Sequence, residues 1–537
     1  MKDSVKRLVA VGIGGRCMRD AGVLASVLLA LASVGAGRAA AATLTVCPRG
    51  CPYTQIGPAL AAASNGDTIE VAAGTYHGGL TVGLSVKLVG AGAGATIISG
   101  DGTVLTIGSF GVNAEPTVFI DGVTITRGVA RSSPESAALA GHDGVWALGG
   151  VVEIPPKAIS AGGFAGGATV TITNSVITGN STAPSASLPS GFAFAGGAGV
   201  DNWGTLTLNN TTVSDNQAGG PVASDASGAG IQNWRNLTLR HTAVLRNRSI
   251  TSAPHGCSAE GGGITSPGKL TIAASAVTGN TAELSSSAVC GDAHGGGIFV
   301  TPHASATISD TTVSHNRVAA SSTVTDASSF AGGIAGYGKL ALRDSMISGN
   351  LVSAATTAAT GTANPTSGGL GIVFPGKATI SDTFITGNDV SATAATGTAV
   401  AEAGGIQTTD TTLSDSLVSG NRLTATSQTG SATVRGAGID HGNGLLDVSD
   451  TTVSDNTATA NGPKGQALGG GVWNDVFFPP PPNPRLTLTK TTVTGNTLTA
   501  SPGITVHGGG LFTTFPTTLT DSTISGNSPD NCFGVSC

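Results

Sequence analysis

Eleven short segments of this chain resemble one another, and each of them ends in asparagine. The first reads TVTITNSVITGN over 169–180, and the last reads TLTDSTISGN over 518–527. Successive closing asparagines are 31 to 40 residues apart. Equivalent residues of stacked repeats lie above one another, so this spacing predicts a solenoid. The closing residues are Asn180, Asn216, Asn247, Asn280, Asn316, Asn350, Asn388, Asn421, Asn456, Asn496 and Asn527.

Apolar and small polar residues alternate within each repeat. Val or Ile stands three residues before every closing asparagine, an aliphatic residue stands eight before it, and Ser or Thr stands five before it. A period of two predicts β-strands, and the many Val, Ile and Thr residues favour the same structure. The repeats show no 3.6-residue period, which excludes helical solenoids.

A second motif, a glycine followed by an aliphatic residue, precedes the first. The distance from this glycine to the closing asparagine is 17 residues in six of ten copies, whereas the following segment varies from 14 to 21. We expect three short strands in the fixed half and loops in the variable half. The fold predicted is all-β, a single right-handed parallel β-helix of about 11 to 14 rungs. The glycines are Gly199, Gly230, Gly263, Gly297, Gly333, Gly371, Gly405, Gly438, Gly471 and Gly510.

The asparagine column has a structural interpretation. Asparagine tolerates sharp corners, and identical side chains in a stack can bond to one another. We therefore expect an asparagine ladder that stabilises the coil.

The sequence predicts that the chain is divided into three parts. Residues 1–42 resemble a signal peptide, because basic residues precede an apolar run over 21–34 and four alanines follow at 39–42. Residues 43–168 are expected to form an N-terminal cap, with a short helix near 56–64, and the first irregular rungs. Residues 169–537 are expected to hold the regular repeats and a disulfide-closed C-terminal end. This organisation predicts a secreted or cell-surface protein with no membrane span in the mature chain.

The cysteines agree with export, because Cys17 lies in the predicted signal peptide and the other six fall into pairs. Two residues 33 apart are expected on neighbouring rungs, and each terminus is expected to carry a small loop closed by a disulfide. A metal site is the rival interpretation of the terminal pairs. The predicted disulfides are Cys47–Cys51, Cys257–Cys290 and Cys532–Cys537.

Charge limits the classes of partner. Charged residues make up 10% of the chain, the net charge is −6, and no basic stripe runs along it. Nucleic acid is therefore not expected as a partner. We expect an extracellular polysaccharide or a cell-surface partner instead.

The N-terminal residues resemble a known superfamily. The segments TQI at 54–56, ALAAA at 59–63 and NGDTIEVAAGTY at 65–76 are similar to the opening of pectate-lyase-like (pectin-lyase-fold) β-helix proteins. Units such as GGGI at 261–264 and STISGN at 522–527 resemble the polymorphic outer-membrane-protein repeat. The resemblance implies a parallel β-helix. It does not imply one activity, because the superfamily includes lyases, hydrolases, epimerases and adhesins.

The chain departs from both groups. We recognise no autotransporter barrel among residues 1–537, and these residues match neither the calcium-binding carboxylate cluster nor the catalytic Arg or Lys of pectate lyases. Any site must therefore be sought in the residues themselves.

An acidic column lies six residues before the closing asparagines. Its carboxylates are expected at corners, where they either bond to backbone N–H groups or bind calcium. No cofactor is required by this pattern, and calcium is the one ion it suggests. The column consists of Asp310, Asp344, Asp382, Asp415, Asp450 and, after a gap, Asp521.

Tryptophans beside polar residues suggest carbohydrate binding, because sugar rings stack on exposed aromatic rings. Asp201 and Trp203 lie in the same register as Gln232 and Trp234 on the next rung, and Trp473 lies on a later rung. The alternative is that the paired rings pack on each other over a turn.

Candidates for acid–base catalysis come in pairs. Glu260 and His294 share a register on adjacent rungs, as do Glu402 and Arg435, while Asp440 and His441 are consecutive. Ion pairs between rungs are also ordinary features of solenoids and stabilise them little.

Two functions follow from these patterns. The leading hypothesis is a β-helix protein that binds extracellular polysaccharide or acts as an adhesin. The alternative is a polysaccharide lyase or glycoside hydrolase with its site beside the variable loops. Columns of Thr and Ser also suggest ice binding, but Asn209, Arg240, Ala273 and Arg343 interrupt one of them.

Overall fold

The computed structural model describes most of the chain beyond residue 39. The described residues are 40–100, 102–108, 115–130, 145–147, 152–154, 158–160, 163–165, 167–183, 193–221, 223–252, 258–286, 291–373, 375–476 and 485–537. Residues 41–537 form one compact unit. The predicted signal peptide and the predicted Cys257–Cys290 disulfide lie outside the described residues, apart from the last three residues of that peptide.

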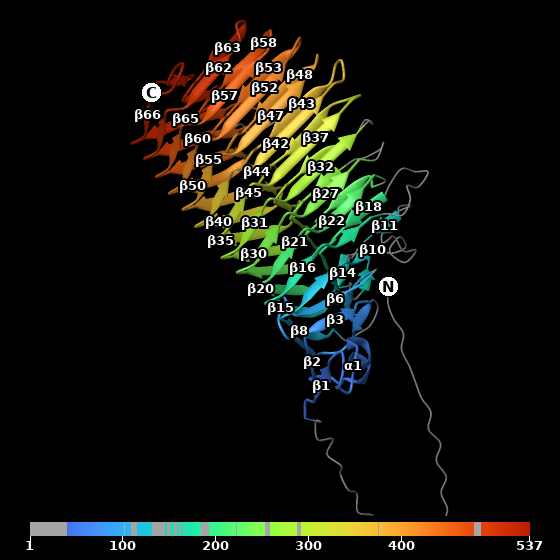
Figure 1. The fold of residues 1–537 in the computed structure, drawn as a ribbon. Helices are drawn as coiled ribbons and strands as arrows, with labels where there is room; N and C mark the ends of the chain where they lie inside the picture. The colour runs from blue at the N-terminus through green and yellow to red at the C-terminus, as the bar shows by residue number, and fades with distance from the viewer. Residues whose placement is uncertain are drawn as a thin grey trace, which may run out of the picture. The chain divides into compact units, whose positions relative to one another are not determined.

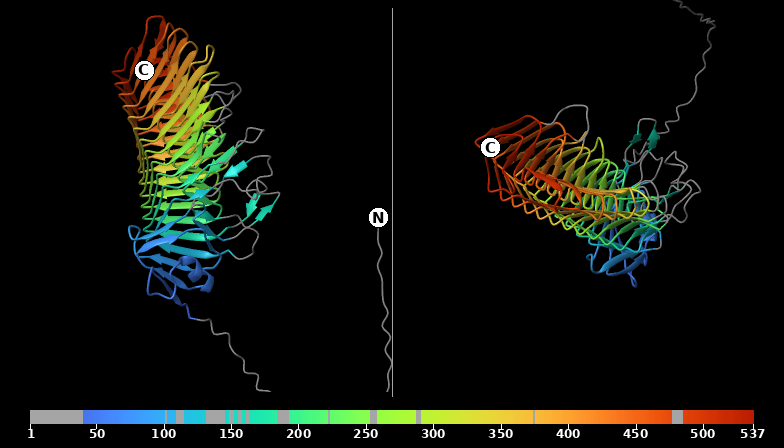
Figure 2. Two further views of the ribbon diagram at one scale, coloured as in Figure 1. Left: turned by 45° about the vertical axis from the view of Figure 1, so that its right-hand side comes forward. Right: turned by 90° about the horizontal axis from the view of Figure 1, so that it is seen from above.

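Five long parallel sheets build the stack of coils (Figure 1). We name them by the strands at their ends. Sheet A runs from β1 (Thr43–Val46) to β65 (Thr517–Thr520), sheet B from β3 (Gly74–His77) to β66 (Thr523–Ser525), and sheet C from β4 (Leu80–Val82) to β67 (Cys532–Phe533). Sheet D runs from β10 (Val129–Ala130) to β62 (Thr497–Ala500), and sheet E from β11 (Val145–Ala147) to β63 (Ile504–His507). Figure 2 shows the coils following one another in chain order.

One coil passes through all five sheets in the order A, B, D, E, C. An example consists of β20 (Thr205–Asn209), β21 (Thr212–Ser214), β22 (Gln217–Gly220), β23 (Asp225–Ser227) and β24 (Ile231–Asn233). Eleven coils have this form, since sheets D and E have eleven strands each. The predicted parallel β-helix is confirmed. The expectation of three strands in every coil is wrong, because the variable half forms sheets D and E.

Two apolar layers fill the stack. The aliphatic columns of sheets A, B and C form one continuous core, from Val46 to Ile524. The inner faces of sheets D and E form a second core that consists mainly of alanine, such as Ala354 of β42 (Leu351–Thr356) and Ala399 of β48 (Thr398–Glu402). The residues between these inner ones along sheets C and E therefore point outward, because side chains alternate along a strand.

The closing asparagines form the ladder that their spacing predicts. Asn350, for example, donates from Nδ2 to Asn388 Oδ1 at 2.9 Å and to the Val313 carbonyl at 3.1 Å, and its own Oδ1 accepts from Asn316 Nδ2 at 3.0 Å. The same bond joins every neighbouring pair from Asn180 to Asn527. The amides from Asn180 to Asn496 are nearly inaccessible to solvent, so their bonds satisfy groups that water cannot reach, whereas Asn527 at the end is partly exposed.

The motif glycines make room for the ladder. A Cβ atom on Gly199 would lie 2.9 Å from Asn216 Nδ2 and 2.5 Å from the Gly230 carbonyl oxygen of the next coil. Strand pairing also corrects one position of the motif. Ile334 pairs with Leu370, so Gly369 occupies the place that the sequence assigned to Gly371.

Both ends of the stack carry local covers. Helix α1 (Ile56–Ala62) buries Ile56, Ala59 and Leu60 against the first coils, as its sequence predicts. Disulfides join Cys47 to Cys51, with Cα atoms 5.6 Å apart, and Cys532 to Cys537, with Cα atoms 6.2 Å apart. Within the described residues, α1 and every other helical segment are too short to cross a membrane.

Candidate functional site

The candidate residues gather where sheet E ends and sheet C begins. In one coil the chain passes from Glu260 at the end of β28 (Ser258–Glu260) through three glycines to β29 (Ile264–Ser266). Gly261 has φ +47°, and a Cβ atom there would lie 2.5 Å from the Ile264 carbonyl oxygen. This tight turn brings the last outward side chain of sheet E close to the first outward side chain of sheet C. We call the outward residues on both sides of the turn the E–C strip.

Eight of the nine carbohydrate-binding and catalytic candidates lie on this strip. They come from six different coils, and the sequence alone did not show that they share one surface. His441 and the acidic column lie elsewhere. The eight residues are Asp201, Trp203, Gln232, Trp234, Glu260, His294, Asp440 and Trp473.

The two tryptophans at the N-terminal end of the strip stack on each other. The ring centroids of Trp203 and Trp234 are 4.3 Å apart, and their planes differ by 12°. Both indole N–H groups donate to Asp201, at 3.0 and 2.9 Å. Trp203 is only 9% exposed, and Gln232 is buried and accepts from Ser227 Oγ. The expected open platform is therefore a packed pair, of which Trp234 keeps partial exposure.

The middle of the strip holds an aromatic and acidic cluster. Glu260, His294 and Phe330 are Cα partners on consecutive coils, in β28, β33 (Asp292–His294) and β38 (Ala327–Phe330). The rings of Phe299, Phe330 and Tyr337 lie 5.4 to 6.0 Å from the His294 ring. Phe299 belongs to β34 (Ile298–Val300), and Tyr337 follows β39 (Ile334–Gly336). Sequence reasoning missed all three rings, because they occupy three different positions of the repeat: Phe330 ends a strand of sheet E, Phe299 lies within a strand of sheet C, and Tyr337 follows one.

Burial changes the acidity of this cluster. It raises the pKa of Glu260 to about 7, and the negative charge of Asp225 adds to this shift. Burial lowers the pKa of His294, although the charge of Asp292 opposes the effect. The pKa of Tyr337 rises to about 12, mainly through burial and also through Asp292 and Glu260. At neutral pH, Glu260 thus exchanges its proton readily beside a neutral imidazole and a protonated phenol.

The side chains of this cluster are partly accessible. Glu260, His294 and Tyr337 each keep some exposure to solvent, whereas Phe299 and Phe330 are 6% exposed. Among the described residues, neither a hydrogen bond nor an ion pair joins Glu260 to His294, and His294 Nδ1 is buried without a partner. The cluster therefore retains polar atoms that a bound molecule can satisfy.

A second ionisable cluster lies deeper, toward the C-terminal end of the strip. Arg435, at the end of β53 (Ser431–Arg435), pairs with Glu402 of β48, and its guanidinium lies 5.0 Å from the centre of the Trp473 ring. Asp440 of β54 (Ile439–His441) is 0% exposed, and its carboxylate oxygens have no hydrogen-bond partner among the described residues. Burial and the charge of Glu402 raise the pKa of Asp440 well above its ordinary value. Glu402, Asp440 and Trp473 are buried, and Arg435 keeps partial exposure. Because these groups pack mainly on one another, we regard the cluster as structural.

His441 does not act with Asp440, because consecutive side chains of a strand point to opposite faces. His441 points inward, in register with Asn474 of β59 (Val472–Asn474). Its Nδ1 lies 3.3 Å from the Thr408 carbonyl oxygen, and its Nε2 lies 3.2 Å from that of Gly444. Burial lowers its pKa to about 4. The structure thus separates the predicted Asp440–His441 pair.

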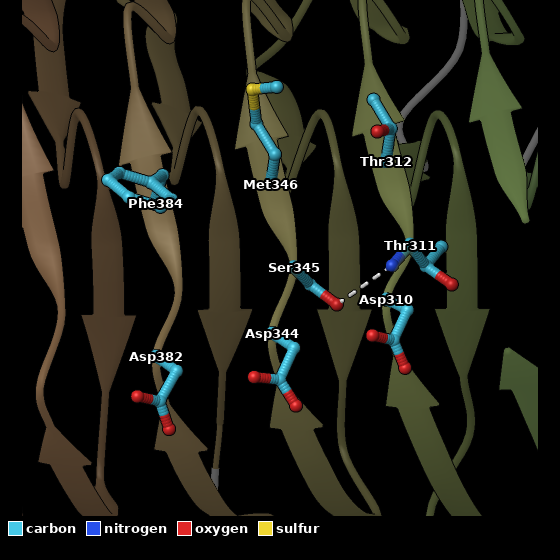
Figure 3. Close-up of a pocket in the computed structure, with 8 residues that line it drawn as sticks. All are labelled: Asp310, Thr311, Thr312, Asp344, Ser345, Met346, Asp382 and Phe384. Atoms are coloured by element: carbon cyan, nitrogen blue, oxygen red, sulfur yellow. Dashed lines mark hydrogen bonds between the residues drawn. The ribbon is translucent and has the colours of Figure 1, made fainter. Parts of the chain in front are cut away.

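The acidic column lies at the corner between sheets A and B, on another side of the coil. Asp310, Asp344 and Asp382 are exposed, and the close-up shows them in a row, one on each of three neighbouring coils, with Met346 and Phe384 on the same coils (Figure 3). All six column residues have φ between +47° and +50°, and so do Ala274 and Lys490 at the same corner. The corner geometry therefore does not require a carboxylate.

The corner hydrogen bonds come from the next residue, not from the aspartate. Ser345 Oγ donates to the Arg343 carbonyl at 2.7 Å, and Arg343 pairs with the Asp344 carboxylate at 2.6 Å. In the described part of the chain, nowhere do three or more His, Cys, Asp or Glu side chains come close enough to hold a metal ion. Calcium binding by this column stays a prediction.

Comparisons with known proteins add the following findings. The chain matches no family model and no curated protein. Among solved structures, the A-module of mannuronan C-5 epimerase AlgE6 from Azotobacter vinelandii is 12% identical, with 86% of this chain and 93% of that chain covered at TM-score 0.28. The Agl-KA catalytic domain is 12% identical, with 86% and 64% covered at TM-score 0.31. Pectin methylesterase PemA from Erwinia chrysanthemi is 9% identical, with 64% and 78% covered at TM-score 0.21.

These similarities are too low to carry an argument about activity. The architecture follows from the strand pairing of the chain itself, and it agrees with the pectin-lyase-like β-helix that the N-terminal residues resemble. The function must be argued from the E–C strip.

Proposed function

We propose that this protein is secreted or held at the cell surface, where it binds an extended polysaccharide along the E–C strip. The observation that carries the proposal is the concentration of rings on this one surface. Aromatic residues make up only 4% of the chain, yet seven rings lie along the strip, and two of them, Trp234 and Tyr337, keep partial exposure to solvent. The other five are buried, and they are Trp203, Phe299, Phe330, Trp473 and Phe512. Rings interspersed with hydrogen-bonding groups suit the faces and hydroxyl groups of sugars.

The repeat of the coil supports an extended ligand. Neighbouring strands of a sheet are about 4.8 Å apart, so equivalent side chains recur at about the length of one pyranose ring. Partly exposed side chains recur along the strip at Trp234, Glu260, His294 and Tyr337. A linear chain of sugars that follows the stack therefore meets a new side chain at every coil. A folded or branched ligand would not keep this register.

The test measures retention of the purified protein on a panel of immobilised polysaccharides. We expect retention on at least one of them, with at least about fivefold weaker binding for Tyr337→Ala, because a stacked ring contributes about 1 kcal/mol. The control is Phe384→Ala, which removes an aromatic side chain that is 54% exposed on sheet B, outside the strip. Equal effects of the two substitutions, or no retention on any glycan, would contradict the proposal.

Catalysis on the bound polysaccharide is the second candidate function. It rests on Glu260, whose pKa of about 7 suits a general acid or base, beside the neutral His294. Turnover would appear as unsaturated products for a lyase or as new reducing ends for a hydrolase. Glu260→Gln should abolish either product even at glycan concentrations that saturate the variant. A variant that keeps full turnover would exclude Glu260 from catalysis.

A further inference from the structure

The charges along the N-terminal half of the E–C strip have one sign. The outward residues of the five coils from Asp201 to Tyr337 include the four carboxyl groups of Asp201, Asp225, Glu260 and Asp292. On sheets E and C of these coils all outward positions are described, and none of them is Lys or Arg. Arg235, one residue beyond Trp234, is the nearest exposed basic side chain in sequence. A polyanion on this surface would be repelled, since like charges raise each other's energy.

Glu260 and the groups around it come from four consecutive coils. Asp225 lies on β23, Asp292 and His294 lie on β33, and Tyr337 follows β39. Asp292 is exposed, Asp225 is partly buried, and the His294 ring is neutral at pH 7 because burial lowers its pKa. The imidazole therefore does not offset the acidic groups. Asp201, in contrast, already accepts the two indole N–H groups and is not available to a ligand.

The rings beside these acids give an independent indication of the same ligand charge. The negative face of an aromatic ring attracts cations, and boxes of rings recognise ammonium groups. The centroid of the Tyr337 ring lies 5.7 Å from that of Phe299 and 5.6 Å from that of Phe330. The buried, unpartnered Nδ1 of His294 lies within this group of rings. Rings and carboxylates at one place thus both favour a positively charged group with N–H donors.

We propose that the polysaccharide of the E–C strip carries free amino groups, and that Glu260, Asp292 and the Tyr337 ring recognise its ammonium groups. This inference rests on the proposed function and deepens it. In such a complex the positive charge of the bound ammonium lowers the pKa of Glu260 from its value of about 7 and so favours its carboxylate form. The ammonium then donates hydrogen bonds to the two carboxylates, while the pyranose faces lie against the rings. N-acetylation of the same polymer removes the charge and leaves the backbone unchanged. That pair of ligands isolates the contribution of charge.

The experiment compares soluble oligomers of glucosamine with N-acetylglucosamine oligomers of the same length and with an oligogalacturonate, at a pH where the amino groups are protonated. Dissociation constants are measured by calorimetry. We expect the glucosamine oligomer to bind at least about tenfold more tightly than either of the others. We also expect Glu260→Gln with Asp292→Asn to weaken this binding at least about tenfold while changing the binding of the acetylated oligomer by less than about twofold.

A matched control separates recognition from general attraction to an acidic protein. Asp344→Asn with Asp382→Asn removes two exposed carboxylates at the A–B corner, away from the strip. This control should leave glucosamine binding unchanged within about twofold. Equal losses in the two double variants would overturn the inference, because they would show non-specific charge attraction. Circular dichroism on every variant establishes that the fold is retained.

The remaining outcomes distinguish recognition of amino groups from the proposed binding of polysaccharide in general. Tighter binding of the acetylated oligomer or the oligogalacturonate would overturn the inference, and the proposed polysaccharide function would stand. Binding of none of these oligomers, together with no retention on the wider panel, would overturn both. Retention of some other polysaccharide without amino groups would overturn only the inference.

Discussion

Single residues of this chain take their roles from the face on which they lie. Asp440 and His441 are neighbours in sequence, yet Asp440 points to the E–C strip and His441 points into the coil. Trp203 and Trp234 could be predicted to meet, because their registers match. Their exposure could not, because it depends on Asp201 accepting both indole N–H groups. The register of a repeat can be predicted from its sequence, whereas the packing around each position cannot.

His441 should make the protein sensitive to acid. Its folded pKa of about 4 lies below the ordinary value of 6.5, so the unfolded chain takes up the proton first as the pH falls from 6.5 toward 4. The contribution of the neutral His441 side chain to the free energy of unfolding is therefore fully present above pH 6.5 and is lost as the pH falls from 6.5 to 4. Because Asn474 occupies the same position in the next coil, His441→Asn should fit and should reduce the loss between pH 7.5 and pH 5 by about 2 kcal/mol.

The measurement is denaturant unfolding of both proteins at the two pH values. The variant should be nearly as stable as the wild type at pH 7.5 and more stable at pH 5. Parallel pH profiles would contradict the assignment. They would show that hydrogen bonds to the Thr408 and Gly444 carbonyls keep the imidazole as easily protonated in the folded protein as in the unfolded one.

At the scale of strands and columns, the strands of sheets A, B and C could be predicted from the sequence, whereas those of sheets D and E could not. Strand β42, with the sequence LVSAAT, alternates small residues, and alanine is a weak strand former that also suits loops and helices. Its partners β37 (Arg317–Ser322) and β47 (Asp389–Ala394) are equally poor in large apolar residues. The length of this segment also varies, which is typical of loops. Stacking, rather than propensity, makes these segments strands.

The asparagine ladder should be strongest in the middle of the stack. Asn350→Ala would remove the side-chain acceptor of the Asn316 backbone N–H, one of the two acceptors of Asn316 Nδ2, and the side-chain donor to the Val313 carbonyl, in a region closed to water. Each unsatisfied group costs about 1–3 kcal/mol, so we expect a loss of at least about 3 kcal/mol in the free energy of unfolding. Urea unfolding followed by circular dichroism measures it.

Asn527→Ala is the matched control at the end of the ladder. Asn527 is partly exposed, and water can replace its bonds to Asn496. We expect its loss to cost less than about half as much as the loss of Asn350. Equal costs at the two positions would show that the ladder does not depend on burial.

At the scale of the whole molecule, stability is distributed along the stack and the ends are its weak points. Contacts link each coil to its two neighbours, so the terminal coils have one neighbour each. At the C-terminal end, β67 pairs with β64 (Leu511–Thr513), and the Phe533 ring stacks on Phe512 with centroids 5.0 Å apart. The Cys532–Cys537 disulfide closes this last segment.

Deleting residues 528–537 should therefore expose strand edges that can pair with another molecule. We expect faster amide exchange in β64 and a concentration-dependent rise in molecular mass, with little change in the middle coils. Hydrogen exchange by mass spectrometry and light scattering measure the two effects. Unchanged exchange in β64 together with an unchanged mass would show that the segment does not protect the end of the stack.

The direction of the asparagine ladder has a consequence for how the length of such a chain can change. Every internal coil presents amide donors toward the following coil and an amide oxygen toward the preceding one. A whole internal repeat can thus be duplicated or lost by unequal recombination, and the two new neighbours still fit each other. The two ends of the ladder differ from its internal members. The Gly128 backbone N–H donates to Asn180 at one end, and Asn527 donates to Asn531 at the other, so these terminal segments cannot be exchanged for an internal repeat. Natural selection can therefore adjust the length of the proposed binding surface one repeat at a time.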